Sequence, residues 1–186
     1  MKTKIITKLT PLNEIIELSD ECKRCSKCCN HGSGYILNDE VSKIAKFLNV
    51  AEEKLKQDYL EEAEVFGRKV LKAKTENTGN KFPVTLAKAH VNKNKVPGKC
   101  VFSGANGCNI HPAKPLHCKI ANCNEYGEEL NQWFLLNHIV NPSNPESVRQ
   151  WATHLKFNDP IPGGRLKEII KDQEKLKEIL GYRKLR

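Results

Sequence analysis

The amino-acid sequence predicts an α+β fold, consisting of a small irregular domain with short strands, flanking helices and a helical C-terminal extension. Three observations lead to this prediction. Eight cysteines fall into two groups, within residues 22–29 and within residues 100–123. Short β-prone segments lie between the groups, and apolar residues recur at helical spacing after each group. We expect residues 1–123 to form the cysteine-cluster domain and residues 124–186 to form a helical extension packed on it.

The N-terminal half is predicted to begin with an extended segment and to continue with two helices. Residues 1–21 are predicted to form an extended segment before the cysteine run, with a strand near Ile15 and Ile16. Asn38 is placed to cap the first helix. The apolar face of that helix, at helical spacing, comprises Val41, Ile44, Ala45 and Leu48. A second helix is predicted over residues 51–64, with one stripe formed by Leu55, Tyr59 and Ala63.

Residues 68–99 are strongly basic and are predicted to contain short strands. Nine Lys or Arg stand against one Glu in this span, which gives +8 of the net charge of +9. The span has no helical stripe, and turn residues at 77–80 and 96–98 divide it. The predicted strands are residues 69–71, 84–86 and 90–91, and then 100–102, which ends at a turn over residues 104–107.

The last third of the chain is predicted to be helical. The first of its helices contains Leu130, Trp133 and Phe134. Asn144 and Pro145 open the next helix as its cap and its first residue. The buried face of this second helix is formed by Val148, Trp151 and Leu155. Prolines and glycines at 160–164 then break the chain, and a final helix runs from Leu166 to a stop at Gly181.

The cysteines are predicted to bind metal rather than to form disulfides. The N-terminus has no continuous apolar region typical of a secretory signal, so we expect the thiols to lie in the reducing cytoplasm. No apolar run approaches the roughly 20 residues that a membrane helix needs. Thiolates are soft ligands that suit zinc and iron–sulfur clusters. The small irregular domain is therefore expected to be metal-bound and to draw folding free energy from the metal.

The spacing of the first group favours an iron–sulfur cluster slightly over Zn²⁺. Cys22, Cys25 and Cys28 repeat a Cys-x2-Cys step twice, the kind of loop that wraps around a cluster. Zinc usually takes its cysteines in pairs, although four of these thiolates would also suit it. Because neighbouring side chains usually diverge, Cys28 and Cys29 are predicted to face different sites, or one of them to bridge.

The second group supplies the remaining candidate ligands. His111 and His117 lie among these cysteines and are alternatives to a thiolate. The metal-ligand candidates are Cys22, Cys25, Cys28, Cys29, Cys100, Cys108, Cys118 and Cys123, the last of which also reads as a buried thiol. The other histidines are predicted to be solvated or structural at positions 31, 90 and 154, and His138 to be a core residue.

The run from Cys22 to Cys29, with its following Gly-rich turn, resembles the CxxCxxCC (YkgJ-like) cysteine-cluster family of zinc- or iron-chelating domains. The segment from Cys100 through Lys114-Pro115 to Cys118 resembles the second block of that family, so the resemblance covers about residues 22–120. Lys114 and Lys119 stand where the family has arginines. The resemblance implies a metal or iron–sulfur domain and a link to flagellin lysine methylases. That activity does not transfer, because the sequence has no Gly-rich nucleotide loop.

Three functions follow from these features. The first is a cytoplasmic cysteine-cluster protein that holds an iron–sulfur cluster or zinc, with a redox or protein-modification role and an unknown protein or acidic partner. The second is a zinc-stabilised nucleic-acid-binding module that uses residues 68–99, although a solvated lysine-rich surface is the favoured reading of that span. The third is a metal-dependent enzyme with a base among Glu125, Glu128 and Glu129, which read more readily as helix-capping residues.

Overall fold

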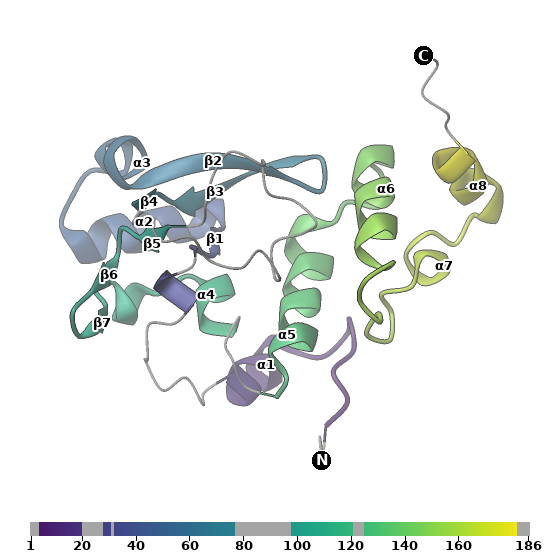
Figure 1. Ribbon diagram of the computed structural model, residues 1–186, viewed down its shortest axis with the longest axis horizontal. Coiled ribbons are helices and arrows are strands. Elements are labelled where there is room, and N and C mark those ends of the chain that lie inside the picture. The colour runs from purple at the N-terminus through teal and green to yellow at the C-terminus, as the bar shows by residue number, and fades with distance from the viewer. Residues whose placement is uncertain (1–3, 20–27, 31, 77–97, 121–124, 182–186) are drawn as a thin grey trace.

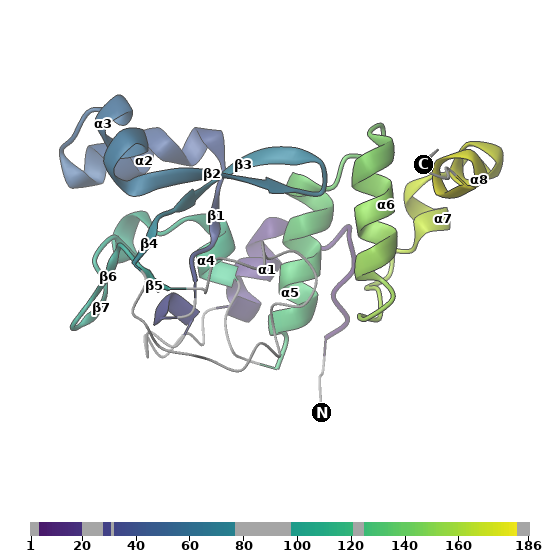
Figure 2. The same cartoon turned by 45° about the horizontal axis from the view of Figure 1, so that its top comes forward.

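The computed structural model describes residues 4–19, 28–30, 32–76, 98–120 and 125–181. Its helices and short antiparallel sheets confirm the predicted α+β class (Figure 1). The largest sheet has three strands in the order β1-β3-β2, built from Tyr35–Ile36, Arg68–Ala73 and Leu60–Val65. In Figure 2, α1, α4 and α5 lie together below the hairpin of β2 and β3, and the C-terminal helices α6 to α8 lie beyond its tip.

The N-terminal segment is helical where a strand was predicted. Helix α1 spans Leu12–Ser19, so the predicted strand near Ile15 and Ile16 is wrong. Ile15 is completely buried and Ser19, one turn later, is also buried, whereas Ile16 is 38% exposed. This burial repeats at helical rather than strand spacing, because the chain packs one side of α1 on α4 and α5.

Helix α2, Asn38–Leu48, confirms the first predicted helix, with Val41, Ile44 and Ala45 buried. The cap differs from the prediction, because Leu37 is the capping residue and Asn38 is already helical. The Leu37 N–H donates to Glu40 Oε2 at 2.9 Å. A carboxylate from the first turn therefore binds the backbone N–H of the capping residue.

The second predicted helix is too long. Helix α3 covers only Glu52–Tyr59, and the next six residues form strand β2. This strand pairs with β3 from Leu60 opposite Ala73 to Val65 opposite Arg68. Its exposed glutamates alternate with less exposed neighbours, at the spacing of a strand. The pairing partner lies further along the chain, so it overrides the local helical pattern.

The hairpin of β2 and β3 turns through Phe66 and Gly67, which both adopt left-handed conformations with φ of 50° and 64°. A two-residue loop with positive φ at both positions matches the right-handed twist of the flanking strands, although a bulky side chain is unusual at such a position. Phe66 is only 2% exposed and packs edge-on against Trp151, with ring centroids 5.7 Å apart. Burial of this ring on α6 offsets the strain of its backbone conformation.

Shorter elements surround the cysteines. Strand β3 contains the predicted strand at 69–71, whereas the predicted strand at 100–102 is replaced by β5, which ends at Cys100. A second hairpin of β6 and β7 turns over residues 104–107, as predicted. The other elements are η1 Cys28–Asn30, β4 Thr75–Glu76, β5 Lys99–Cys100, β6 Ser103–Gly104, β7 Gly107–Cys108, η2 His111–Ala113 and α4 Leu116–Ile120. The predicted strands at 84–86 and 90–91 lie outside the described residues.

The predicted C-terminal helices form with one difference. Helix α5, Gly127–Phe134, continues into a π-helical turn, η3, over Leu135–Ile139. Helix α6, Pro145–His154, is capped by Asn144, whose side chain accepts the Glu146 N–H at 2.9 Å. The single final helix is instead split into α7 Leu166–Ile169 and α8 Gln173–Gly181. The split occurs because Asp172 Oδ1 accepts two backbone N–H groups and starts a new helix.

Two hydrophobic clusters position the site. One joins α1, the hairpin tip and α4 to α5 and α6, around Phe134 and Trp151. The other packs α2 and α3 on β1, β2 and the segment that carries Phe102, Ile110 and Ala113. In the part of the chain that the structure describes, no helix combines the length and apolar character needed to cross a bilayer.

Candidate metal centre

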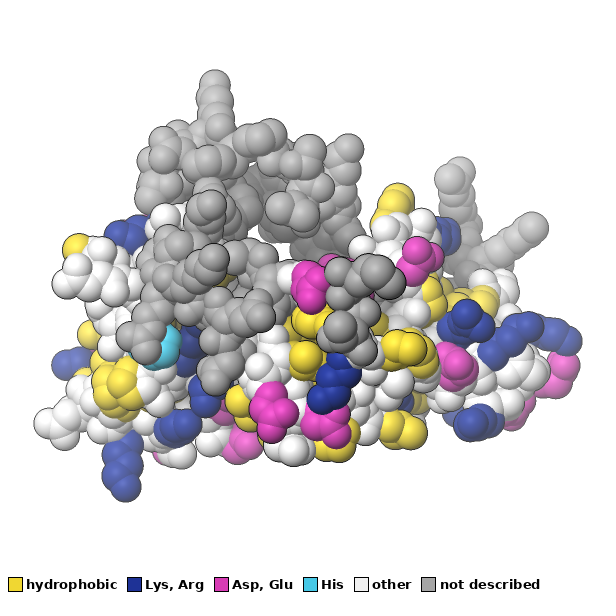
Figure 3. Space-filling view, turned by 90° about the horizontal axis from the view of Figure 1, so that it is seen from below, with side chains coloured by type: hydrophobic (Ala, Val, Ile, Leu, Met, Phe, Trp, Pro, Cys, Tyr) yellow, Lys and Arg dark blue, Asp and Glu magenta, His cyan; other side chains and the backbone are white. Residues whose placement is uncertain are grey.

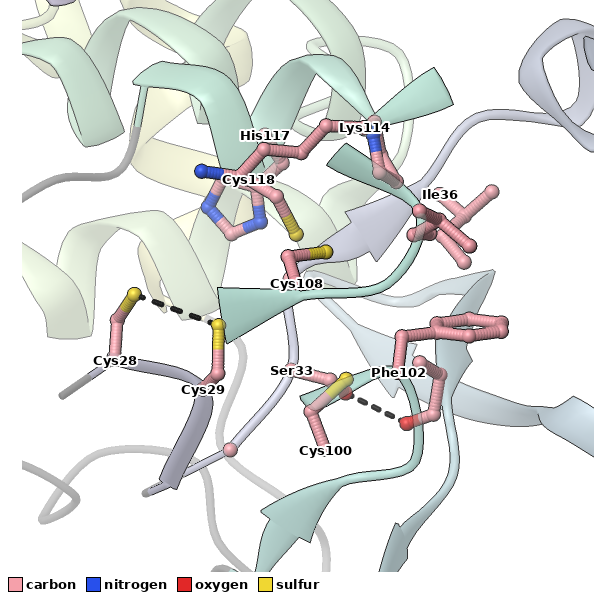
Figure 4. Close-up of a pocket in the computed structure, with 15 residues that line it drawn as sticks. Cys28, Cys29, Ser33, Ile36, Cys100, Phe102, Cys108, Lys114, His117 and Cys118 are labelled. Atoms are coloured by element: carbon pink, nitrogen blue, oxygen red, sulfur yellow. Dashed lines mark hydrogen bonds between the residues drawn. The ribbon is translucent and has the colours of Figure 1, made fainter. Parts of the chain in front are cut away.

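Five cysteines from four separate segments line one cavity of about 240 Å³. Cys28 and Cys29 come from η1, and the other three come from β5, β7 and α4. Figure 4 shows the thiols of Cys28, Cys29, Cys100, Cys108 and Cys118 around this common space. The fold therefore brings together both cysteine groups of the sequence, which are separated by about 70 residues along the chain.

The remaining three candidate ligands, Cys22, Cys25 and Cys123, lie outside the described residues. Among the residues that are described, no three His, Cys, Asp or Glu side chains lie close enough together to bind a single ion. The described thiols are instead spread over the wall of the cavity. Which cysteines share a site stays a prediction.

Cys28 and Cys29 do not diverge as neighbouring side chains were expected to. Both line the cavity, and their sulfurs are 3.8 Å apart (Figure 4). Both residues lie in the 3₁₀ turn η1. A hydrogen bond from Cys29 lowers the pKa of the Cys28 thiol to about 6, and the Lys114 charge acts in the same direction. The same hydrogen bond, with burial, raises the pKa of Cys29.

Burial affects the thiols of Cys100 and Cys118. Burial raises the pKa of Cys100, and it raises that of Cys118 to about 12. Two backbone groups oppose this effect, since hydrogen bonds from Phe102 to Cys100 and from Gly34 to Cys118 lower the respective pKa values. Hydrogen bonds to sulfur favour the thiolate, the form that binds metal.

Gly34 allows β1 and α4 to approach closely beside Cys118. A Cβ atom at Gly34 would overlap Cys118 Sγ, and it would also lie 3.2 Å from His117 Nδ1 and 3.3 Å from the Cys118 nitrogen. The second glycine of the Gly-rich turn is therefore required by space at the site rather than by an unusual φ angle.

His117 lines the cavity, and both of its ring nitrogens contact other residues. Its Nδ1 accepts the Tyr35 N–H at 2.8 Å, so the proton is on Nε2, which lies 3.0 Å from Asn131 Oδ1. The ring is stacked between Tyr35 and Phe134, with centroids 4.8 and 4.4 Å away. Burial lowers its pKa to about 4, so the ring is neutral at pH 7. These contacts do not support the alternative in which His117 replaces a thiolate, and they join α4 to β1 and α5.

Glu40 is a second supporting residue beside the site, at a position that the sequence did not single out. Its Oε1 accepts the Leu116 N–H at 2.6 Å, while Oε2 accepts the Leu37 N–H at 2.9 Å. One carboxylate thus joins the first turns of α2 and α4. Glu40 supplies the carboxylate half of a capping box, but Leu37 lacks the Ser or Thr side chain that would make the pattern recognisable in the sequence.

The other candidate residues have structural positions. Glu128 and Glu129 lie in the first turn of α5, as expected of helix-capping carboxylates. His154 is buried and stacked on Trp151 at 4.8 Å, whereas His138 is half-buried against Trp133 and Phe134. His111 lies in η2 and is not among the described residues that line the cavity. The histidines at 31 and 90 lie outside the described residues.

Comparison with family models agrees with this arrangement. The model named CxxCxxCC, described as "Putative zinc- or iron-chelating domain", matches residues 21–134. The chain belongs to the CxxCxxCC family. The CxxCxxCC match extends further than the resemblance over residues 22–120, and it includes the Asn131 and Phe134 contacts to His117. Searches of curated proteins and of solved structures give no match. Thiolates are ligands that suit both zinc and iron–sulfur clusters, in agreement with the CxxCxxCC description.

Proposed function

We propose that the cavity holds an iron–sulfur cluster bound by cysteine thiolates and that the protein has a redox role. The observation that carries the proposal is the spread of five cysteines, from four segments, around one cavity of about 240 Å³. A cavity of about 150 Å³ accommodates a molecule as large as benzene, so this space is far larger than one metal ion requires. A cluster needs such room, because its irons take thiolates at separate corners.

The surroundings of the thiols support a cluster. Ile36, Ala73, Phe102 and Ile110 form apolar wall beside the sulfurs. Apolar surroundings and hydrogen bonds to sulfur are the means by which proteins adjust the potential of a cluster. The cluster would supply one-electron transfer when bound, and the chain would supply the thiolates, the backbone donors of Phe102 and Gly34, and the exclusion of water.

Zinc is the second candidate for the same cavity. Zn–S bonds of about 2.3 Å put the sulfurs of a tetrahedral site about 3.8 Å apart. The Cys28 and Cys29 sulfurs have this separation, 3.8 Å. A zinc site would use this pair together with two other cysteines. It would be structural, since zinc does not change oxidation state.

Metal and sulfide analysis of protein purified without oxygen separates the two candidates. We expect a brown protein with iron and acid-labile sulfide, and an absorption that bleaches with a one-electron reductant. Cys100→Ser and Cys118→Ser should each lower the iron content, whereas Ser147→Ala, a buried side chain in α6, should retain it. A colourless protein with one or two zinc ions per chain, and no sulfide, would refute the iron–sulfur proposal.

The nucleic-acid alternative receives less support. Lys69 pairs with Glu62 at 3.1 Å and Lys72 pairs with Glu61 at 3.0 Å, so these two lysines are partly neutralised within the sheet. On the face shown in Figure 3, the basic and acidic side chains of described residues are interspersed. Most of the basic span, residues 77–97, lies outside the described residues. Binding of DNA or RNA that weakens steeply as salt increases would favour this alternative.

A further inference from the structure

A buried lysine stands beside the thiols. Lys114 is only 8% exposed, although lysine is among the residues least often buried. It lies between η2 and α4, and proline residues at 112 and 115 restrict the backbone on both sides. A long cationic side chain is thus held inside the fold at a fixed point of attachment.

The Lys114 side chain lines the same cavity as the five cysteines. Figure 4 shows it extending along one side of the cavity, next to His117 and Cys118. Its positive charge lowers the pKa of two thiols, Cys28 in η1 and Cys118 in α4. The ammonium group therefore acts on sulfurs that two distant segments of the chain contribute.

Lys114 is the one basic side chain carrying a full charge among the described residues of the cavity wall, since His117 is neutral there. A cluster together with four thiolate ligands carries a net negative charge, and one-electron reduction adds a further negative charge. A fixed positive charge stabilises the reduced form more than the oxidised form. The difference is larger in a buried, apolar site than in water.

We propose that Lys114 is a positioning residue that stabilises the reduced state of the bound cluster and thereby raises its reduction potential. This inference rests on the proposed iron–sulfur function. The electron comes from an external one-electron donor and enters the cluster. No bond to Lys114 forms or breaks.

The test is a redox titration of the full-length, cluster-loaded protein with dithionite and mediators. Lys114→Met removes the charge while keeping an unbranched chain of similar length, and Lys114→Arg keeps the charge. Lys119→Met is the matched control, because Lys119 lies in α4, five residues after Lys114, and is not among the described residues lining the cavity. In Lys114→Met we expect the ratio of reduced to oxidised cluster at a fixed potential to fall at least tenfold, which is a midpoint lower by about 59 mV for one electron. Lys114→Arg and Lys119→Met should stay close to the wild type.

A Lys114→Met protein with full iron and sulfide content and an unchanged midpoint would overturn the inference. If Lys114→Met loses the cluster, Lys114→Gln provides a second neutral side chain for the same titration. Loss of the cluster from both neutral variants, with retention in Lys114→Arg, would assign Lys114 to cluster assembly and would also overturn the proposal. Zinc in place of iron in the wild type would instead refute the proposed function itself, and metal analysis identifies that case before any titration.

Discussion

Substitution of Gly34 by alanine should disturb the cavity without changing any proposed ligand. The added methyl group would overlap Cys118 Sγ and would press on His117 Nδ1 at 3.2 Å. His117 has little freedom to move, because the Tyr35 N–H and Asn131 hold both of its ring nitrogens. The strain must therefore be relieved by moving β1 away from α4, or by rotating the Cys118 thiol away from its present position.

The size of the effect follows from the overlap. Overpacking of this kind costs about 1–3 kcal/mol. For a protein of this length, a loss of about 2 kcal/mol lowers Tm by about 4–8 °C. Disturbing a group that orients a metal ligand typically costs about 10–100-fold in metal affinity. We therefore expect Gly34→Ala to unfold at a lower temperature and to lose metal to a chelator more readily than the wild type.

The measurements are a thermal unfolding curve and the rate of metal loss to a competing chelator. Gly181→Ala is the matched control, because a Cβ at Gly181, at the end of α8, would meet no atom within 4 Å. The control should retain the wild-type metal content and should not unfold at a lower temperature. If Gly34→Ala behaves like Gly181→Ala in both measurements, the close approach of β1 and α4 does not shape the metal centre.

Three other predictions concern the groups around the cavity. Burial lowers the pKa of His117 to about 4 from 6.5, so below pH 6.5 the unfolded chain binds a proton that the folded chain does not. The free energy of unfolding of the metal-free protein should therefore fall by about 2 kcal/mol between pH 7 and pH 5. Urea titrations should show a smaller fall in His117→Gln. An equal fall in the variant would contradict the lowered pKa of His117 as the cause. Glu40→Gln should lose about 1–3 kcal/mol of stability, because the amide presents a donor to a backbone N–H, whereas Glu53→Gln, at an exposed position in α3, should have no effect. If Cys28 and Cys29 serve different centres, Cys29→Ser should lower the number of metal ions bound per chain. If the wild type binds one ion or cluster and Cys29→Ser binds the same amount, the two-site hypothesis is excluded.

Elements with strong local signals were predictable from the sequence. Helices α2, α5 and α6 form where the apolar spacing and the Asn144 cap indicate. The prediction failed where distant residues decide the conformation. Residues 60–65 carry a helical pattern, and they become a strand because β3 pairs with them. Residues 12–19 were too short and mixed for their helix to be recognised, since packing on α4 and α5 stabilises it.

The candidate site was predictable in its chemistry and less so in its geometry. The spacing of the cysteines indicated thiolate ligands, and the five cysteines among the described residues line one cavity. The sequence could not indicate that His117 is occupied on both ring nitrogens, because its partners lie at positions 35 and 131. The same holds for Glu40, which joins two helices whose starts are separated by 78 residues.

The buried Phe66 ring at the hairpin tip determines where the chain can be divided. The family match ends at residue 134, whereas the surface that covers Phe66 is provided by Trp151 and His154 of α6. A fragment cut at the family boundary would leave this ring exposed on the hairpin that carries β3, the central strand next to β1. We therefore expect the segment able to fold alone to be longer than the family match and to reach at least through α6.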